Sequence, residues 1–159
     1  MPFQNRYPLR VNVGFLISQP VGSYRDIHFE VEDLALSEDL TIHQLKGIAR
    51  YNRTPSGILV QGDFDASTTL ECVRCLTEYS QSLKIHFDEL YALRSRPISE
   101  NGLVLPEDYN LDLAPLVREY FVLEEPISPI CKPDCKGLCS VCGEDLNVRT
   151  CEHQLKKQG

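Results

Sequence analysis

The sequence lacks any apolar run that approaches the roughly 20 residues a membrane-spanning helix needs. Its first twenty residues, MPFQNRYPLRVNVGFLISQP, contain only a short alternating apolar patch that Asn12 and Gly14 interrupt. This alternation of Val11, Val13, Phe15 and Ile17 is typical of a strand rather than of a signal peptide. We therefore expect a cytoplasmic protein with no membrane partner.

The chain also lacks the motifs of several common enzyme classes. It contains no P-loop, no GxSxG and no HExxH, and neither an internal repeat nor a low-complexity tract. We therefore expect no catalytic residue and no small-molecule substrate, and we predict that the protein is not an enzyme.

Positive charge is scarce: 16 Lys and Arg stand against 23 Asp and Glu, a net charge of −7. Residues 1–130 hold 11 of the basic and 19 of the acidic residues, whereas residues 131–159 hold 5 and 4. An acidic body disfavours strong non-specific binding to nucleic acid, which depends on neutralising phosphates. The acidic surface either meets a basic partner or only keeps the protein soluble, and the sequence leaves both readings open.

Period-two alternation dominates residues 1–95. Apolar and polar side chains alternate in four segments, 26–32, 45–51, 57–66 and 82–90. This period is typical of half-buried antiparallel strands, and NRTPSG at 52–57 is typical of a turn between two of them. We therefore predict an antiparallel β-rich domain over residues 1–95.

Residues 96–130 are predicted to form a linker loop followed by one helix. The stretch Ser95–Asn110 has no clear period and contains two prolines and a glycine. Apolar residues at helical spacing then predict an amphipathic helix over about 113–124, with Asp112 as its N-cap and Pro126 beyond its end. We expect its apolar stripe to pack on the sheet: Leu113, Leu116, Val117, Tyr120 and Phe121.

Five of the seven cysteines lie in the last 29 residues. In a reducing cytosol, clustered cysteines are more often metal ligands than disulfides. Cys139-Ser-Val-Cys142-Gly143 is typical of a zinc knuckle, where a glycine after the second cysteine permits a positive φ. We therefore predict a zinc-ribbon-like tail over residues 131–159, and an α+β fold for the chain as a whole.

Seven cysteines and His153 provide eight ligands, enough for two tetrahedral zinc sites. The favoured partition forms site 1 from Cys72, Cys75, Cys131 and Cys135, and site 2 from Cys139, Cys142, Cys151 and His153. The alternative is a single zinc ion bound by Cys131, Cys135, Cys139 and Cys142, which leaves Cys72 and Cys75 as free thiols. Two full sites with mostly thiolate ligands would be structural, because a catalytic zinc keeps an open position.

Three motifs follow one another between Leu70 and Cys151: LECVRCLTEY, LDLAPLVREYFVLEEPISPIC and DCKGLCSVCGEDLN. They resemble the YceD-like large ribosomal RNA subunit accumulation proteins, a family of bacteria and plastids. Many members end the tail in Cys-x-Cys, where this chain has Cys151-Glu152-His153, and histidine is an ordinary replacement for a zinc-binding cysteine. Other relatives lack the C-terminal knuckle. The matching residues are Cys72, Cys75, Cys131, Cys135, Cys139, Cys142, Gly143 and Asn147.

The resemblance implies a non-enzymatic ribosome-biogenesis factor that supports accumulation or processing of large-subunit ribosomal RNA. Its partner would be that RNA or a ribosomal protein. The alternative function is a protein-binding module whose acidic domain holds a basic ribosomal protein before assembly. Direct RNA contact would use the basic residues of the tail, for which solubility is the other reading: Lys132, Lys136, Arg149, Lys156 and Lys157.

Overall fold

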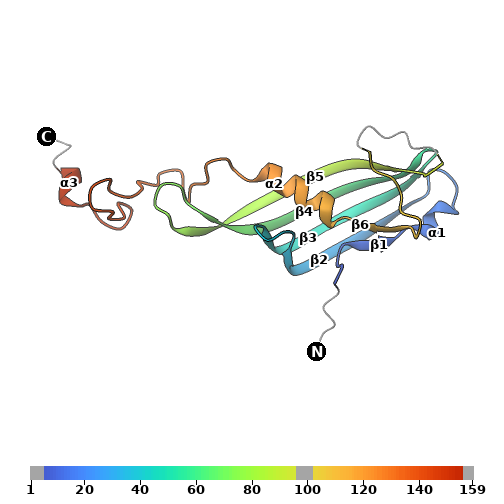
Figure 1. Cartoon of the computed structure of the whole chain (residues 1–159), viewed down its shortest axis with the longest axis horizontal. Coiled ribbons are helices and arrows are strands. Elements are labelled where there is room, and N and C mark those ends of the chain that lie inside the picture. The colour runs from blue at the N-terminus through green and yellow to red at the C-terminus, as the bar shows by residue number, and fades with distance from the viewer. Residues whose placement is uncertain (1–5, 96–101, 156–159) are drawn as a thin grey trace, which may run out of the picture. The chain divides into compact units, whose positions relative to one another are not determined.

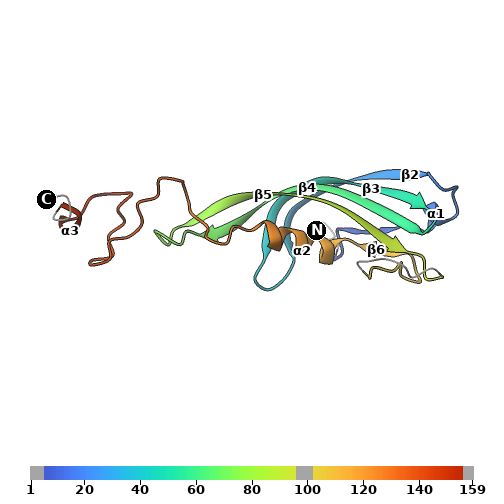
Figure 2. The same cartoon turned by 90° about the horizontal axis from the view of Figure 1, so that it is seen from above.

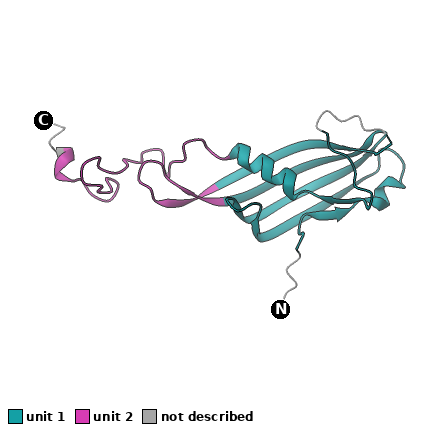
Figure 3. Ribbon diagram, in the orientation of Figure 1, with its two compact units in different colours: residues 1–67, 82–124 teal, residues 68–81, 125–159 magenta. Residues whose placement is uncertain are grey.

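The computed structural model describes residues 6–95 and 102–155 of the chain. It contains two compact units (Figure 3). Unit 1 comprises residues 1–67 and 82–124, and unit 2 comprises residues 68–81 and 125–159. Among the described helices, none is long and apolar enough to cross a membrane.

Unit 1 is built on a four-stranded sheet with the strand order β2-β3-β4-β5 (Figure 1). Its strands are β2 (Tyr24–Ala35), β3 (Thr41–Thr54), β4 (Gly57–Glu71) and β5 (Glu78–Ala92), of which the last two also enter unit 2. All four predicted strand segments lie within them. The registers of β2 with β3 and of β3 with β4 are antiparallel. The predicted antiparallel β-rich fold is therefore confirmed.

A second sheet pairs β1 (Arg10–Asn12) with β6 (Asn110–Asp112). The sequence pattern predicted that the strand at the start would run on to Ile17, and this is wrong beyond Asn12. The Asn12 side chain accepts a hydrogen bond from the Gly14 N–H at 2.9 Å, which turns the chain into the short helix α1 (Gly14–Ile17). Strand β6 begins at the end of the predicted linker loop.

Helix α2 (Ala114–Glu124) is the predicted amphipathic helix, starting one residue later than expected. The Asp112 carboxylate accepts a hydrogen bond from the Ala114 N–H at 3.0 Å, satisfying a donor of the first turn. Within the apolar stripe, the Tyr120 hydroxyl donates to the Glu89 carboxylate of β5 at 2.7 Å. The second of these hydrogen bonds joins α2 to the sheet of unit 1.

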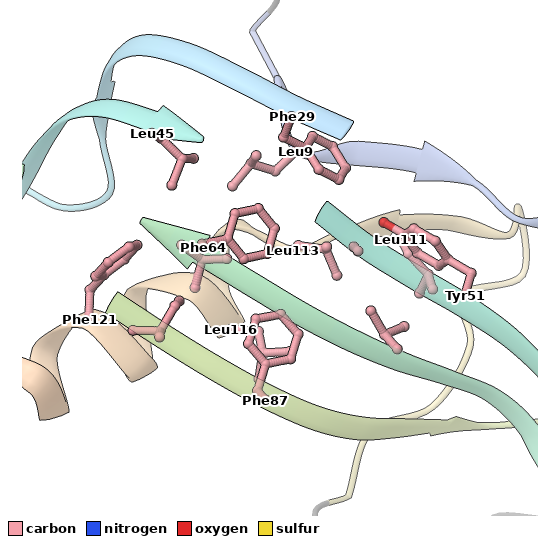
Figure 4. Packing of buried hydrophobic residues seen from close by; sticks show 14 of the residues in the cluster. Leu9, Phe29, Leu45, Tyr51, Phe64, Phe87, Leu111, Leu113, Leu116 and Phe121 are labelled. Carbon is pink, nitrogen blue, oxygen red and sulfur yellow. The ribbon is translucent and has the colours of Figure 1, made fainter. Parts of the chain in front are cut away.

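One hydrophobic core lies between the sheet and the layer formed by α2 and the small sheet. Seen from above, the four long strands curve over α2 and β6 (Figure 2). Phe64 and Phe87 of the sheet, Leu111 of β6, and Leu116 and Phe121 of α2 enter the same core (Figure 4). Unit 1 therefore has a complete apolar core of its own.

The boundaries of the two units differ from those of the three regions predicted from the sequence, which were 1–95, 96–130 and 131–159. Helix α2 and strand β6 are part of unit 1, because their apolar residues belong to its core. The CVRC turn is part of unit 2 together with the cysteine-rich tail. The reason for this second difference is that the side chains of Cys72 and Cys75 cluster with those of Cys131 and Cys135.

Candidate metal centres

The described part of unit 2 has almost no apolar core. Among its described residues, the buried hydrophobic side chains are all cysteines: Cys72, Cys75, Cys135 and Cys139. Tyr79, Ile130, Cys131 and Leu138 are only partly buried around the first three. Hydrophobic burial alone is thus a weak source of stability for this unit.

Site 1 begins on the loop between β4 and β5. The Leu76 N–H donates to the Cys72 carbonyl, and the Cys72 N–H donates to the Thr77 carbonyl, both at 2.9 Å. Leu76 takes a positive φ of 62° in this turn. The closed turn places the side chains of Cys72 and Cys75 on the same side, where both are buried.

Backbone hydrogen bonds join this loop to the segment that follows α2. The Val73 N–H donates to the Pro129 carbonyl at 2.9 Å, and the Leu138 N–H donates to the Arg74 carbonyl at 3.2 Å. The Arg74 guanidinium also donates to the Cys135 carbonyl at 3.0 Å. Two thiols distant in sequence are thereby brought to Cys72 and Cys75.

The four thiols of site 1 have the spacing of a tetrahedral metal site. The Sγ atoms of Cys72 and Cys135 are 3.7 Å apart, as are those of Cys75 and Cys131. All four Sγ atoms lie within 4.8 Å of one another. A tetrahedron with zinc–sulfur bonds of about 2.3 Å has sulfur–sulfur edges of about 3.8 Å. The site therefore fits a zinc-sized ion.

The surroundings of site 1 favour thiolates at two of its positions. Burial opposes ionisation of Cys72, but backbone N–H groups, first that of Cys75, lower its pKa to about 6. The Asn147 amide lowers the pKa of Cys135. In contrast, burial and then the neighbouring thiols raise the pKa of Cys131 to about 12. A cation among the four sulfurs would remove that repulsion, since metal coordination deprotonates a thiol.

Site 2 is formed by Cys139, Cys142, Cys151 and His153, whose ligand atoms also lie within 4.8 Å of one another. The Gly143 N–H donates to the Cys139 carbonyl at 2.9 Å, and Gly143 has the positive φ, 76°, that the knuckle requires. The backbone N–H groups of Cys142 and Val141 lower the pKa of Cys139 to about 6. The knuckle therefore favours a thiolate at its first position.

His153 lies on the short helix α3 (Glu152–Leu155). Its Nδ1 atom is buried and has no hydrogen-bond partner among the described residues. An unpaired ring nitrogen beside three thiols is what a bound metal ion would satisfy. Site 2 is more open than site 1, because Cys142 is exposed and both Cys151 and His153 are only partly buried.

The structure groups the eight residues in the same two sets of four that the sequence favours. The alternative set of Cys131, Cys135, Cys139 and Cys142 is divided between the two groups. Each group offers four ligands, so neither has an obvious open position for a substrate. The arrangement is thus suited to holding chain segments together.

The basic residues predicted to contact RNA are only partly available. Lys132 and Lys136 are exposed. The Arg149 guanidinium forms an ion pair with the Glu144 carboxylate, which occupies one of the five predicted cations. Lys156 and Lys157 lie outside the described residues. Sequence reasoning assigned no role to Arg74 or Asn147, although both lie within the family motifs and Arg74 directly precedes Cys75.

Comparison with known proteins identifies the family of the chain. A family model described as "Large ribosomal RNA subunit accumulation protein YceD" matches residues 60–158. The chain belongs to the YceD family. The matched range includes every ligand of both sites, and it confirms the resemblance seen in the three sequence motifs.

Individual relatives of the YceD family agree with this assignment. The chain is 35% identical over 150 residues to uncharacterized proteins of Mycobacterium bovis and Mycobacterium tuberculosis, covering 87% of this chain and 71% of each relative. It is also 40% identical over 47 residues to a chloroplastic protein of Arabidopsis thaliana named "Large ribosomal RNA subunit accumulation protein YCED homolog 1", covering 30% of this chain and 15% of that one. No solved structure matches the chain.

Proposed function

We propose that the chain is a non-enzymatic factor of ribosome biogenesis that supports the accumulation or processing of large-subunit ribosomal RNA. Its membership of the YceD family over residues 60–158 carries this proposal. The names of the chloroplastic relatives of Arabidopsis thaliana and Zea mays refer to the same process. In this proposal the two cysteine-rich sites hold zinc ions and have no part in chemistry.

The donor sets support zinc at both sites. Four thiolates, or three thiolates and one imidazole, are soft donor sets that suit zinc rather than magnesium or calcium. Thiolates also place negative charge on the metal, which weakens it as a Lewis acid. Zinc supplies four-coordinate crosslinks here, and the residues around the sites orient the sulfurs through backbone N–H groups.

The charge of each unit argues against tight binding to naked RNA. Unit 1 contains 10 Lys and Arg against 16 Asp and Glu, and unit 2 contains 6 against 7. Seven thiolates and two zinc ions would together add a charge of −3. We therefore propose that the protein meets large-subunit RNA within a ribonucleoprotein particle, where proteins already neutralise part of the phosphate charge.

A second candidate function is the holding of a basic ribosomal protein before assembly. The observation in its favour is the outward face of the large sheet. Lys46, Arg50 and Lys84 lie on this face, paired with Glu30, Asp26 and Asp65. Three further carboxylates, of Asp33, Asp63 and Asp88, pair with the imidazoles of His43 and His86. This acidic excess would complement a lysine-rich protein.

Complementation in cells tests the leading proposal. In a host cell whose own relative is deleted, we expect the ratio of large-subunit to small-subunit ribosomal RNA to fall. The intact chain should restore the ratio, and a Cys72→Ser chain produced at the same level should restore it less. An unchanged ratio in the deleted cells would contradict the proposed function.

Co-sedimentation separates the two candidates. A factor that acts on RNA precursor particles should still travel with them after salt has removed loosely bound ribosomal proteins. A holder of a free ribosomal protein should instead be found in a small complex near the top of the gradient. Crosslinking of the recovered fractions would then identify the residues in contact.

A further inference from the structure

Asn147 lies in the chain between the two ligand pairs of site 2, yet its side chain contacts site 1. Its Nδ2 group donates a hydrogen bond to the Cys135 Sγ atom at 3.4 Å. Its Oδ1 atom accepts a hydrogen bond from the Lys136 backbone N–H at 2.9 Å. One side chain of the site 2 segment thus holds both a site 1 ligand and the residue after it.

The position of Asn147 is itself fixed. The Asp145 carboxylate accepts hydrogen bonds from the Asn147 backbone N–H at 2.9 Å and from its Nδ2 group at 3.0 Å. The Leu146 N–H donates to the Gly137 carbonyl at 2.9 Å, and Leu138 forms an antiparallel bridge with Asp145. Residues 145–147 are therefore docked on residues 135–138 by several bonds.

Both docked segments, residues 135–138 and residues 145–147, are followed in the chain by ligands of site 2. Cys139 follows Leu138, and its N–H donates to the Glu144 carbonyl at 2.8 Å. A metal ion at site 2 would clamp the knuckle at Cys139 and Cys142 to the later pair at Cys151 and His153. The loop that presents Asn147 would then be closed at both of its ends, which lowers the entropy lost when it docks.

We propose that Asn147 couples the two metal sites, so that filling site 2 strengthens metal binding at site 1 and filling site 1 strengthens it at site 2. Reciprocity follows because coupling between two binding equilibria is a single free energy. The inference rests on the proposed metal occupancy of both sites, and not on the role in RNA accumulation. Asn147 is a positioning residue in it, since it acts on the metal through Cys135.

Two effects of opposite sign contribute to the coupling free energy between the two metal sites. A site with four thiolates and a zinc ion carries a charge of −2, and one with three thiolates and an imidazole carries −1, so mutual repulsion disfavours filling both. The hydrogen bond from Asn147 works in the other direction, because an N–H donor stabilises a metal-bound thiolate. Loss of such a partner around a metal site typically lowers metal affinity about 10–100-fold. Salt screens the repulsion between the two charged sites. The stabilisation of site 1 by the Asn147 hydrogen bond should therefore exceed this repulsion.

Titration of the metal-free full chain with Co²⁺, alone and in competition with a chelator, tests the proposal. The visible absorption of Co²⁺ distinguishes a four-thiolate site from one with three thiolates and an imidazole, so both affinities can be followed. We expect Asn147→Ala to lower the affinity of site 1 about 10–100-fold. Asn147→Asp should lower it at least as much, because a carboxylate cannot donate to the sulfur. The matched control is Val148→Ala, whose side chain is 77% exposed, and it should bind as the unmodified chain does.

A double-mutant cycle with Cys142→Ser isolates the coupling from the local effect. Disabling site 2 should weaken site 1 in the unmodified background, and should weaken it much less when Asn147 is already alanine. Equal effects of Cys142→Ser in both backgrounds, or none in either, would overturn the coupling. Failure of the unmodified chain to bind metal would instead overturn the proposed metal sites themselves.

Discussion

The Sγ atoms of Cys72 and Cys135 lie 3.7 Å apart, although 63 positions separate the two residues in the chain. This distance is far from the roughly 2.05 Å of a disulfide, and it matches one edge of a tetrahedral zinc–thiolate site. Cys75 and Cys131 form a second edge of the same length. A turn in the first half of the chain and a tail in the second half are thus parts of one ligand set.

The two sets of four candidate ligands predict the metal content of the protein. We expect close to two zinc ions per chain in protein purified without chelator, measured by elemental analysis and by native mass spectrometry. Cys72→Ser and Cys142→Ser should each reduce the content by about one ion, because they belong to different ligand sets. A content near one that Cys72→Ser leaves unchanged would favour the single-site alternative.

Metal removal should unfold unit 2 and leave unit 1 folded. The described apolar core lies in unit 1, whereas the buried side chains of unit 2 are largely cysteines of the candidate metal sites. For a site of this kind, metal binding energy is folding energy. We expect a strong chelator to raise hydrogen exchange across residues 68–81 and 125–155 and to change it little in β2, β3 and α2. A loss of protection that extends equally through the sheet would contradict this independence.

Much of the fold was predictable from the sequence because its signals are local. Strands β2 to β5 are half-buried, so apolar and polar side chains alternate along most of their length, as they do at Ile58, Val60 and Phe64. Helix α2 has an apolar stripe and a capping aspartate. The grouping of the ligands was also predictable, because eight soft donors divide into two sets of four in chain order.

Other features were not predictable because they depend on contacts distant in sequence. The apolar alternation up to Ile17 looks like one strand, but the Asn12 side chain turns the chain after three residues. Strand β6 has only three residues, and it is a strand because β1 pairs with it. The role of Asn147 could not be predicted either, since nothing in its local sequence indicates that its amide faces Cys135.

Gly62 of β4 is required by the close approach of an aromatic ring. A Cβ atom added there would lie 2.4 Å from Cζ of Phe87, which is almost fully buried. We expect Gly62→Ala to destabilise unit 1 by about 1–3 kcal/mol, as overpacking of a filled core does. Chemical denaturation followed by circular dichroism measures it. Lys84→Ala on the exposed face of β5 is the control, with an expected change within about 0.5 kcal/mol. A Gly62→Ala protein as stable as this control would contradict the packing.

The pKa of His86 should lie above the ordinary value for histidine. The hydrogen bond between its Nδ1 atom and the Asp63 carboxylate, at 2.7 Å, raises its pKa above 6.5, and the charges of Asp63 and Asp88 add to the shift. A raised pKa means that this pair stabilises the fold fully at pH values below 6.5, and that the stabilisation is lost as the pH rises through the folded-state pKa. Both side chains are more than half exposed, so the effect on stability should be small.

Nuclear magnetic resonance of the imidazole protons measures this pKa directly. Asp63→Asn should lower the pKa of His86, because the amide cannot supply the negative charge. Asp65→Asn is the matched control, since Asp65 pairs with Lys84 on the next strand. A pKa that Asp63→Asn does not lower would show that the pair does not form in solution.

Binding of the isolated protein to naked RNA should be weak and should depend little on salt. Each phosphate neutralised on a single strand contributes roughly −0.7 to the slope of log affinity against log salt. Of the five basic residues in the tail, Arg149 is already paired with Glu144. If the four lysines each neutralised one phosphate, the slope would reach only about −3, and the acidic excess of both units opposes even that. Filter binding of large-subunit RNA fragments across a salt series provides the measurement. Nanomolar affinity with a slope steeper than about −4 would require a concentrated basic face, and reversal of charge at Lys132 and Lys136 would then show whether the tail supplies it.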